Sequence, residues 1–219
     1  MIVALANAKG GVGKSTLAVH LAAWWKERAV RVALVDADAQ GSSSVWLREA
    51  EQALDVFRLQ TPDDILEGIP KLAREFDHLV VDGPAGLSEV TRAILLVADR
   101  ALLPCGPSAL DQRAANDAIR VLKQAQAIRQ GPPQAALVPN KVQVRHRLSR
   151  ELLETARSLA IPSAGSLRLR QAYADAAGQG TVVWRLGRRG EAAGKEIMEV
   201  FDGLFGTHTP QSGPGIAIG

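Results

Sequence analysis

The chain has 219 residues, of which 47% are apolar and 22% are charged, and it carries a single cysteine, Cys105. This length and composition predict one globular domain with a substantial core, in which Cys105 is a small core residue. A single cysteine excludes an internal disulfide framework and a cysteine-rich metal site, which favours a reducing cytoplasm. No apolar run reaches the roughly 18 residues of a membrane span, and the chain enters its first apolar strand without a signal peptide.

The net charge of +3 is distributed unevenly along the chain. Ten basic and three acidic residues lie between Lys141 and Arg189, so this segment carries +7 and the remainder carries −4. Such a basic segment indicates a polyanionic partner, and a solvated arginine-rich face is the alternative interpretation.

A glycine-rich stretch, AKGGVGKST at residues 8–16, lies between an apolar run and a helical pattern that begins near Ser15. Strand, glycine loop and helix in this order are typical of a phosphate-binding loop, in which backbone N–H groups and a helix N-terminus surround an anion. Lys14 brings a cation to the terminal phosphates, and the Ser15 hydroxyl can bind the accompanying Mg²⁺. The residues expected to bind the nucleotide are Gly10, Gly11, Val12, Gly13, Lys14, Ser15 and Thr16.

Two details make this loop specific. Ala8 stands where the general pattern has glycine, and Lys9 places a second cation inside the loop. The stretch from Lys9 to Ser15 resembles the deviant Walker A motif of the ParA/MinD family of ATPases, and the chain is similar to the small stand-alone, ParF-like ParA proteins. The resemblance implies binding of ATP and Mg²⁺, and an ATP-dependent homodimer in which Lys9 reaches the nucleotide of the partner.

Residues 30–36 form a buried-strand pattern that ends in Asp36, and Asp38 follows two positions later. Acidic residues at the carboxyl end of a parallel strand lie where doubly wound sheets bind their ligands. The segment resembles the second motif of the family, Asp-x-Asp-x-Gln, with Ala39 where proline is common. By that resemblance Asp38 positions or activates the hydrolytic water, and Asp36 supports the metal shell.

A third motif is the apolar strand of residues 76–82, which ends in Asp82-Gly-Pro and resembles a Walker B element. By this resemblance Asp82 holds Mg²⁺ through a water. Asn140, after a further strand, is a candidate for reading the adenine edge, and a plain turn role is equally open. The expected catalytic residues are Lys9, Lys14 and Asp38, and the expected metal-binding residues are Ser15, Asp36 and Asp82.

Strand and helix patterns alternate throughout, which predicts an α/β doubly wound, mostly parallel sheet flanked by helices, of the P-loop type. We expect one domain over residues 1–205 and a disordered tail rich in Gly, Pro, Ser and Thr over residues 206–219. Further helices are expected at 42–52, 61–75, 89–98, 108–129, 147–160 and 190–204, and further strands at 56–59, 100–105, 134–138 and from Ile161 onward.

The family resemblance implies that the ATP-bound dimer binds DNA without sequence preference. It also implies that a ParB-like or other partner protein stimulates slow ATP hydrolysis, and that the cycle segregates a plasmid, a chromosome region or another cargo on the bacterial nucleoid. The basic segment supports this interpretation, because DNA affinity that ignores sequence comes from phosphate contacts. The candidate contacts are Arg145, Arg147, Arg168, Arg170, Arg185, Arg188 and Arg189.

Two other functions stay open on sequence grounds. A MinD-like membrane-positioning ATPase would need a basic amphipathic helix near its C-terminus, whereas residues 196–205 are acidic, so we expect no stable membrane association. A metabolic P-loop enzyme on the same fold would need a small-molecule pocket, which the sequence does not test. We therefore expect a cytoplasmic, nucleoid-associated ATPase.

Overall fold

The computed structural model describes residues 1–206, apart from residues 52, 144, 159 and 160. Within these ranges six strands form one sheet in the order β3-β2-β4-β1-β5-β6, and every neighbouring pair is parallel. This confirms the predicted doubly wound parallel sheet. The strands are β1 (Ile2–Asn7), β2 (Val32–Asp36), β3 (Asp55–Arg58), β4 (His78–Ala85), β5 (Arg100–Cys105) and β6 (Gln134–Pro139).

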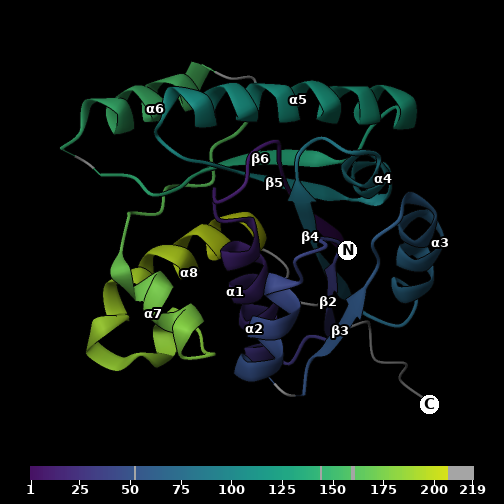
Figure 1. The fold of residues 1–219 in the computed structure, drawn as a ribbon, viewed down its shortest axis with the longest axis horizontal. Helices are drawn as coiled ribbons and strands as arrows, with labels where there is room; N and C mark the ends of the chain where they lie inside the picture. The colour runs from purple at the N-terminus through teal and green to yellow at the C-terminus, as the bar shows by residue number, and fades with distance from the viewer. Residues whose placement is uncertain (52, 144, 159–160, 207–219) are drawn as a thin grey trace, which may run out of the picture.

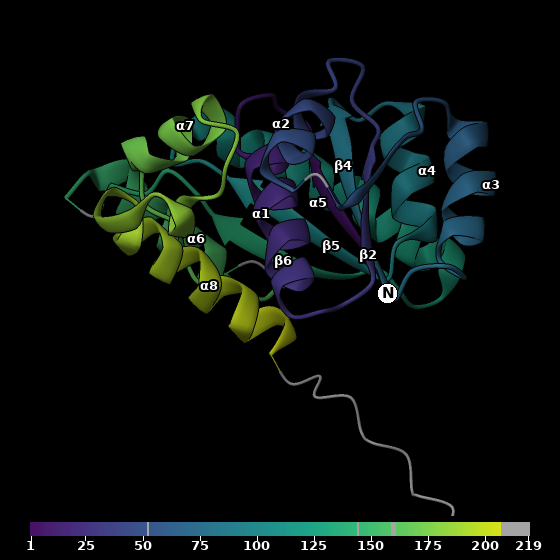
Figure 2. The ribbon, with the colours of Figure 1, turned by 90° about the horizontal axis from the view of Figure 1, so that it is seen from below.

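Helices connect the strands and cover both faces of the sheet (Figures 1 and 2). Two short 3-10 turns, η1 (Val183–Arg185) and η2 (Gly187–Arg189), lie between the last two helices. The helices are α1 (Lys14–Glu27), α2 (Ser42–Ala50), α3 (Pro62–Leu72), α4 (Glu89–Val97), α5 (Ala109–Arg129), α6 (Arg147–Ser158), α7 (Gln171–Gly178) and α8 (Glu191–Phe205). The expected tail, beyond Gly206, lies outside the described residues.

Alternate residues of the central strand β1 face different layers, as the pleat of a strand requires. Val3 and Leu5 are fully buried in the cluster that includes side chains of α1, α2 and α8. Ile2 and Ala4 instead pack in the cluster that includes side chains of α3 and α4. A third cluster joins α5 to β5 and β6 and contains the buried thiol of Cys105, the core position predicted for it. Both faces of β1 are therefore buried, which explains why its sequence is a continuous apolar run and not an alternating one.

Two helix starts carry the caps that their sequences indicate. The Thr61 hydroxyl accepts a hydrogen bond from the Asp64 backbone N–H at 3.1 Å, with Pro62 in the first turn of α3. Ser108 and Asp111 form a capping box at the start of α5. These caps satisfy backbone N–H groups that a helix N-terminus leaves without partners. Each cap therefore marks the residue at which its helix begins.

The strand expected from Ile161 onward is reduced to an isolated bridge between Ser163 and Leu137 of β6. The Leu137 N–H donates to the Pro162 carbonyl at 2.9 Å, and the Ala164 N–H donates to the Leu137 carbonyl at 3.0 Å. A second isolated bridge joins Arg168 to Val142, and the Leu167 N–H donates to the Pro139 carbonyl at 2.8 Å. The two bridges do not form a continuous strand, because Pro162 has no N–H to donate and Gly165 turns the chain between them with a φ of 91°. The prediction of a seventh strand was therefore wrong.

Candidate nucleotide site

The P-loop connects the carboxyl end of β1 to the start of α1 and borders a cavity of about 740 Å³. The three acidic and glycine-rich motifs predicted from the sequence meet here, because β2 and β4 pair in register with Asp36 opposite Asp82 and β4 also pairs with β1. The cavity lies beyond the carboxyl ends of the strands, where this fold class binds ligands. The lining includes Gly10, Gly11, Gly13, Lys14, Ser15, Thr16, Asp38, Ala39, Gln40, Ser42, Asn140, Lys141, Leu167, Arg168, Leu169, Arg170 and Tyr173.

The P-loop backbone needs glycine at two positions. Gly11 has a φ of 71° and Gly13 a φ of 102°, both in the left-handed region. A Cβ atom on Gly13 would also lie 2.2 Å from Nδ2 of Asn140. That amide donates to the Val12 carbonyl at 2.8 Å, so Asn140 holds the P-loop in place. Sequence reasoning missed this contact, and the adenine-reading role of Asn140 stays a prediction.

Lys14 is almost completely buried beneath the loop, and its ammonium donates to the Lys9 carbonyl at 3.2 Å. Burial lowers the pKa of Lys14, and the carboxylates of Asp82 and Asp38 oppose this change. The ammonium therefore lies between the Lys9 carbonyl and the carboxylates of Asp82 and Asp38. An anion that enters the P-loop meets a desolvated cation there, which strengthens their attraction.

Lys9, the second lysine of the loop, has a different partner. Its ammonium pairs with Oδ1 of Asp111 at 2.6 Å, and 42% of its side chain is exposed. The other oxygen of Asp111 accepts from the Ser108 hydroxyl at 2.6 Å. Burial raises the pKa of Asp111, but the hydrogen bonds from Lys9 and Ser108 outweigh this and leave that pKa below its ordinary value. Sequence reasoning did not assign Asp111 to the site, although its helix-capping spacing from Ser108 was a usable signal.

Asp82 has surroundings that fit a metal ion. It is fully buried, and neither carboxylate oxygen has a hydrogen bond of ordinary geometry to the described residues. Burial raises the pKa of Asp82 to about 6, while the nearby hydroxyls of Ser15 and Ser43 and the Lys14 ammonium lower it. A buried carboxylate without a partner is costly unless a cation or water completes it. Oxygen ligands of this kind suit Mg²⁺, so Ser15 and Asp82 fit the predicted metal site.

Asp36 and Asp38 differ in how they are held. Oδ2 of Asp36 accepts from the backbone N–H and the hydroxyl of Ser44, at 2.9 and 2.5 Å, and Oδ1 accepts from the Asp38 N–H at 3.0 Å. Asp36 therefore organises its own loop, which leaves its predicted metal role indirect. Asp38 lines the cavity and is half-buried, with Oδ1 accepting from the Gln40 N–H at 3.0 Å. Its position suits the predicted role toward a water.

Lys141 is a cavity residue that the sequence did not single out. Its backbone has a φ of 57°, and its ammonium donates to the Gly11 carbonyl at 2.7 Å. Lys141 thus presents a third cation to the P-loop, beside Lys9 and Lys14. The only sequence signal was its position directly after Asn140.

The seven candidate DNA-binding arginines fall into two groups. Arg168, Arg170 and Arg185 pair with carboxylates of other helices or loops, and the other four are exposed. Arg168 and Arg170 both pair with Glu196 of α8, and the shortest contact, from Arg170, is 2.6 Å. Only 28% of the Arg170 side chain is exposed, so it is not the exposed cation that the sequence indicated. Arg185 pairs with Glu27 and Glu51. Arg147 makes a longer 3.5 Å contact with Glu151 on the exposed face of α6, and Arg145, Arg188 and Arg189 are exposed.

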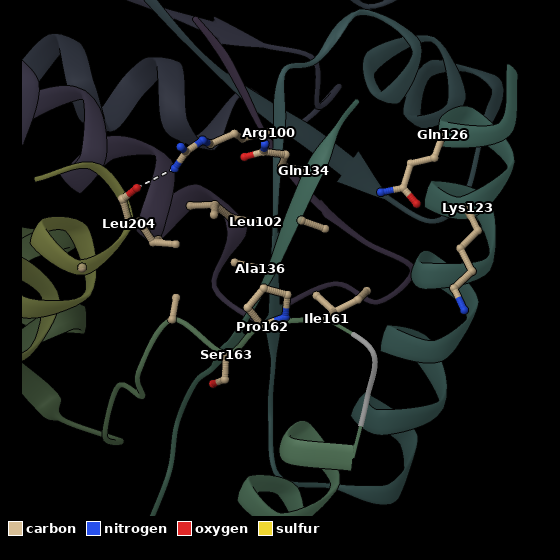
Figure 3. A pocket seen from close by; sticks show the side chains of 13 residues that line it. Arg100, Leu102, Lys123, Gln126, Gln134, Ala136, Ile161, Pro162, Ser163 and Leu204 are labelled. Atoms are coloured by element: carbon tan, nitrogen blue, oxygen red, sulfur yellow. Dashed lines mark hydrogen bonds between the residues drawn. The ribbon is translucent and has the colours of Figure 1, made fainter. Parts of the chain in front are cut away.

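A second cavity, of about 520 Å³, lies beside β5 and β6 and is also bordered by α5 and the end of α8 (Figure 3). Arg100 and Gln134, the first residues of β5 and β6, line it, and Arg100 donates to the Leu204 carbonyl at 2.5 Å. Its floor is apolar and includes Leu102 and Ala136. None of the described residues that line it belongs to the predicted site. The cavity lies near the amino ends of β5 and β6, whereas the P-loop follows the carboxyl end of β1.

Comparison with known proteins agrees with this geometry. A model of the family described as "CobQ/CobB/MinD/ParA nucleotide binding domain" matches residues 3–183. The chain is 33% identical over 208 residues to the maintenance of carboxysome distribution protein A of Halothiobacillus neapolitanus, covering 91% of this chain and 94% of that protein. It is 27% identical over 248 residues to protein IncC of Escherichia coli, covering 91% of this chain and 68% of IncC.

The apo structure of McdA from Cyanothece superimposes with a TM-score of 0.78 at 16% identity, and the match covers 93% of this chain and 98% of that one. This likeness concerns the fold alone. The match of the family model and the identity to the Halothiobacillus protein confirm the resemblance that the P-loop motif indicated. The chain belongs to the CobQ/CobB/MinD/ParA family of nucleotide-binding proteins, with ParA/MinD-type positioning and partition ATPases among its relatives.

Proposed function

We propose that this protein is a Mg²⁺-dependent ATPase that dimerises with ATP, binds DNA through its phosphates and positions a cargo with a partner protein. The observation that carries the catalytic part is that Lys14, Ser15 and Asp38 line one cavity, while the buried, unpartnered carboxylate of Asp82 lies next to Ser15 and Lys14. A cation for the phosphates, a carboxylate for the water and a carboxylate for the metal are the groups that phosphoryl transfer to water requires.

In this proposal the P-loop N–H groups and Lys14 bind the terminal phosphates, and Ser15 and Asp82 hold Mg²⁺. When bound, the metal neutralises charge on the phosphate oxygens. Asp38 orients the attacking water from the wall of the same cavity. Asp36 contributes by holding the loop that carries Asp38, as its hydrogen bonds to Ser44 and Asp38 suggest.

The dimer is supported by the placement of Lys9. Lys9 is not among the described residues that line the cavity of its own protomer, and its exposed ammonium is paired with Asp111. If Lys9 left this pair, Asp111 would still accept hydrogen bonds from the Ser108 hydroxyl and backbone N–H, so its carboxylate would keep partners. The charge of Lys9 is therefore available to the phosphates of a second copy.

DNA binding is supported by the exposed arginines at Arg145, Arg188 and Arg189 and by the exposed Arg147. Contacts from arginine to phosphates give affinity that does not depend on sequence and falls steeply with salt. With this property the ATP-bound dimer would associate with the nucleoid. A ParB-like or other partner that stimulates hydrolysis would then release it locally.

For the cargo, the similarity to a carboxysome distribution protein over 94% of that protein favours a large protein assembly. A plasmid or chromosome region is the second candidate, favoured by the similarity to IncC. Both cargoes use the same DNA-bound cycle in this proposal. They differ in the partner that touches the ATPase.

A MinD-like membrane role is disfavoured by α8. Its apolar residues Ile197, Val200 and Phe201 are buried in the core, so they are not available to a lipid surface. Across the part of the chain that the structure describes, every helix is too short or too polar to span a bilayer. A metabolic role would require a small-molecule substrate beside the nucleotide. Arg168 and Arg170 line the cavity and are the residues at which such a substrate would be tested.

The test measures ATP hydrolysis and the binding of a random-sequence duplex DNA with ATP, with ADP and without nucleotide, over a salt series. We expect DNA binding only with ATP, falling steeply as salt rises. ATPase activity without DNA binding in any state would overturn the DNA part, and vesicles of anionic lipid would then be tested in the same assay. Absence of both ATP binding and hydrolysis would overturn the whole proposal.

A further inference from the structure

Helix α2 begins at the nucleotide cavity. Its first residue, Ser42, lines that cavity together with Asp38. Ser44, in the first turn, donates both its N–H and its hydroxyl to the buried carboxylate of Asp36. A displacement of the loop over residues 36–41 is therefore passed directly to the start of α2.

The other end of α2 is tied to η1 by Arg185. The guanidinium donates to the Ala50 carbonyl at 3.1 Å and to the Glu27 carboxylate at 2.7 Å, and it forms an ion pair with Glu51. Ala50 is the last residue of α2, and Glu51 follows it. One side chain thus joins the carboxyl ends of α1 and α2 to η1. Because three acceptors of the protein occupy its guanidinium, Arg185 is not available to a DNA phosphate.

A second connection runs from the middle of α2. Nε1 of Trp46 donates to the Thr181 carbonyl at 2.8 Å, two residues before η1. The Trp46 ring also lies edge-on to His20, with 5.4 Å between ring centroids, and Nε2 of His20 accepts from the Val183 N–H at 3.1 Å. The segment from Thr181 to Arg185 is therefore held at both ends by α2. This helix has nine residues and is about 13 Å long.

The turn η2, which follows, packs tightly on η1. A Cβ atom on Gly190 would lie 1.7 Å from the Val183 carbonyl oxygen, so the chain passes as close as glycine allows. Arg188 and Arg189 lie on this turn and are exposed. Because the turn is packed on η1, a shift of η1 changes where these two arginines point.

We propose that Arg185 is a positioning residue that ties α2 to the arginine turn, and that nucleotide in the cavity controls the DNA affinity of Arg188 and Arg189 through α2. This deepens the proposed function and rests on it for the identity of the polyanion. Arg185 itself does not contact DNA in this arrangement. The state of the loop over residues 36–41 sets the orientation of the turn instead.

The substitution Glu51→Gln tests the tie, by which we mean the contacts of Arg185 with Glu27, Ala50 and Glu51. A change of charge alone and a loss of the tie predict different results for the ratio of DNA affinity with ATP to that without nucleotide. Loss of a negative charge near the arginines should raise DNA affinity in every nucleotide state. The tie predicts that the ratio of DNA affinity with ATP to that without nucleotide falls by about fivefold or more. Glu199→Gln, on the exposed face of α8, removes the same charge without touching the tie and should leave the ratio unchanged. A Glu51→Gln protein with the wild-type ratio would overturn the proposal.

The substitution Arg185→Lys separates a tie from a DNA contact. Lysine keeps the charge that a phosphate contact needs, but it lacks the planar group that reaches several acceptors at once. The tie predicts the same loss of ATP dependence as for Glu51→Gln, with an unchanged salt slope for DNA binding. A retained ATP dependence would show that the geometry of Arg185 is not needed. ATP affinity and a thermal melt, measured on each variant, establish that its cavity and fold are intact.

Hydrogen exchange distinguishes failure of the tie from failure of the proposed function. In the wild-type protein, ATP should change amide exchange over residues 181–189, and Glu51→Gln should remove most of that change. If this response appears while DNA does not bind in any state, the tie is supported and DNA is the wrong polyanion. If ATP leaves exchange over residues 181–189 unchanged in the wild-type protein, the proposal is overturned.

Discussion

The nucleotide cavity and the arginine-bearing segment between Lys141 and Arg189 are held in place by different means. At the cavity, Asp36 and Asp82 sit opposite each other because β2 and β4 pair in register, and the P-loop follows the neighbouring strand β1. In the arginine-bearing segment, Arg185 is placed by carboxylates on α1 and at the end of α2. A role set by strand register can be predicted from short motifs. A role set by distant side-chain partners needs the fold.

Asp38→Ala should give the largest change, because it removes the carboxylate proposed to orient the water. Turnover should fall by about 10²- to 10⁴-fold, the usual contribution of such a group. ATP binding should persist, because Lys14 and the P-loop are untouched, and the dimer should accumulate. The measurement is steady-state ATPase activity together with the molecular mass in the presence of ATP. Asp63→Ala, on the exposed start of α3, is the control. Wild-type turnover in Asp38→Ala would refute the assigned role.

Lys14→Ala and Lys9→Ala compare the two lysines of the P-loop, which we expect to have different roles. Removing the buried Lys14 should weaken ATP binding by roughly 10- to 100-fold, because a charge-assisted contact to the phosphates is lost. Removing Lys9 should leave the ATP affinity of the monomer near wild type and prevent the dimer, because Lys9 pairs with Asp111 outside the cavity. Fluorescent-nucleotide titration and light scattering separate the two effects. Tight ATP binding by Lys14→Ala would contradict the P-loop assignment.

Much of the fold could be predicted from the sequence, because its signals are local. The alternation of apolar strands and helices indicates a doubly wound sheet, and the caps at Thr61 and Ser108 mark where helices begin. The seventh strand was predicted wrongly because an apolar start at Ile161 does not reveal how many edge hydrogen bonds form. Pro162 and Gly165 interrupt the pairing, so only two isolated bridges form.

The site was predictable to the extent that its residues lie in motifs. Gly13, Lys14 and Asp82 meet as their spacing indicated. Asn140 illustrates the limit, because its contact with the Val12 carbonyl joins positions 128 residues apart, and no short pattern encodes it. Net charge has the same limit, because it does not show which arginines are paired in the fold. The segment that carries +7 draws its neutralising partners, such as Glu27 and Glu196, from outside its own boundaries.

A smaller effect is expected from the arginines, and it distinguishes their two groups. Joint replacement of Arg188 and Arg189 with alanine should lower the salt slope of DNA binding by about 2, because each phosphate contact contributes nearly one unit. Arg170→Ala should leave the slope unchanged, because its guanidinium is occupied by Glu196. The measurement is DNA affinity with ATP across a salt series. An equal loss of slope in Arg170→Ala would show that its ion pair with Glu196 opens on DNA.

The smallest effect at neutral pH concerns His20, the residue that joins the two regions. Its Nδ1–H donates to the Thr16 carbonyl at 2.7 Å, and Nε2 accepts from the Val183 N–H at 3.1 Å, so the ring is held in one neutral tautomer. Burial lowers the pKa of His20 to about 4, and the hydrogen bond to the Thr16 carbonyl opposes this only in part. Protonation of Nε2 would direct a second N–H at the Val183 donor.

The sign of the pH dependence follows from this pKa. Between pH 6.5 and about 4 the unfolded chain binds a proton at His20 that the folded chain does not, so the free energy of unfolding falls as pH falls through this window. The loss is at most ~3 kcal/mol at the acid end and is absent above pH 7. Asp82 has a raised pKa, so its contribution to the free energy of unfolding changes with pH in the opposite direction. The quantity to measure is therefore the difference in free energy of unfolding between wild type and His20→Asn, from denaturant titrations at each pH. His146→Gln, at an exposed position, should match wild type throughout. If the difference between wild type and His20→Asn were the same at pH 7 and pH 4.5, the neutral ring would not be what joins α1 to η1, and the connection would depend on Trp46 and Arg185 alone.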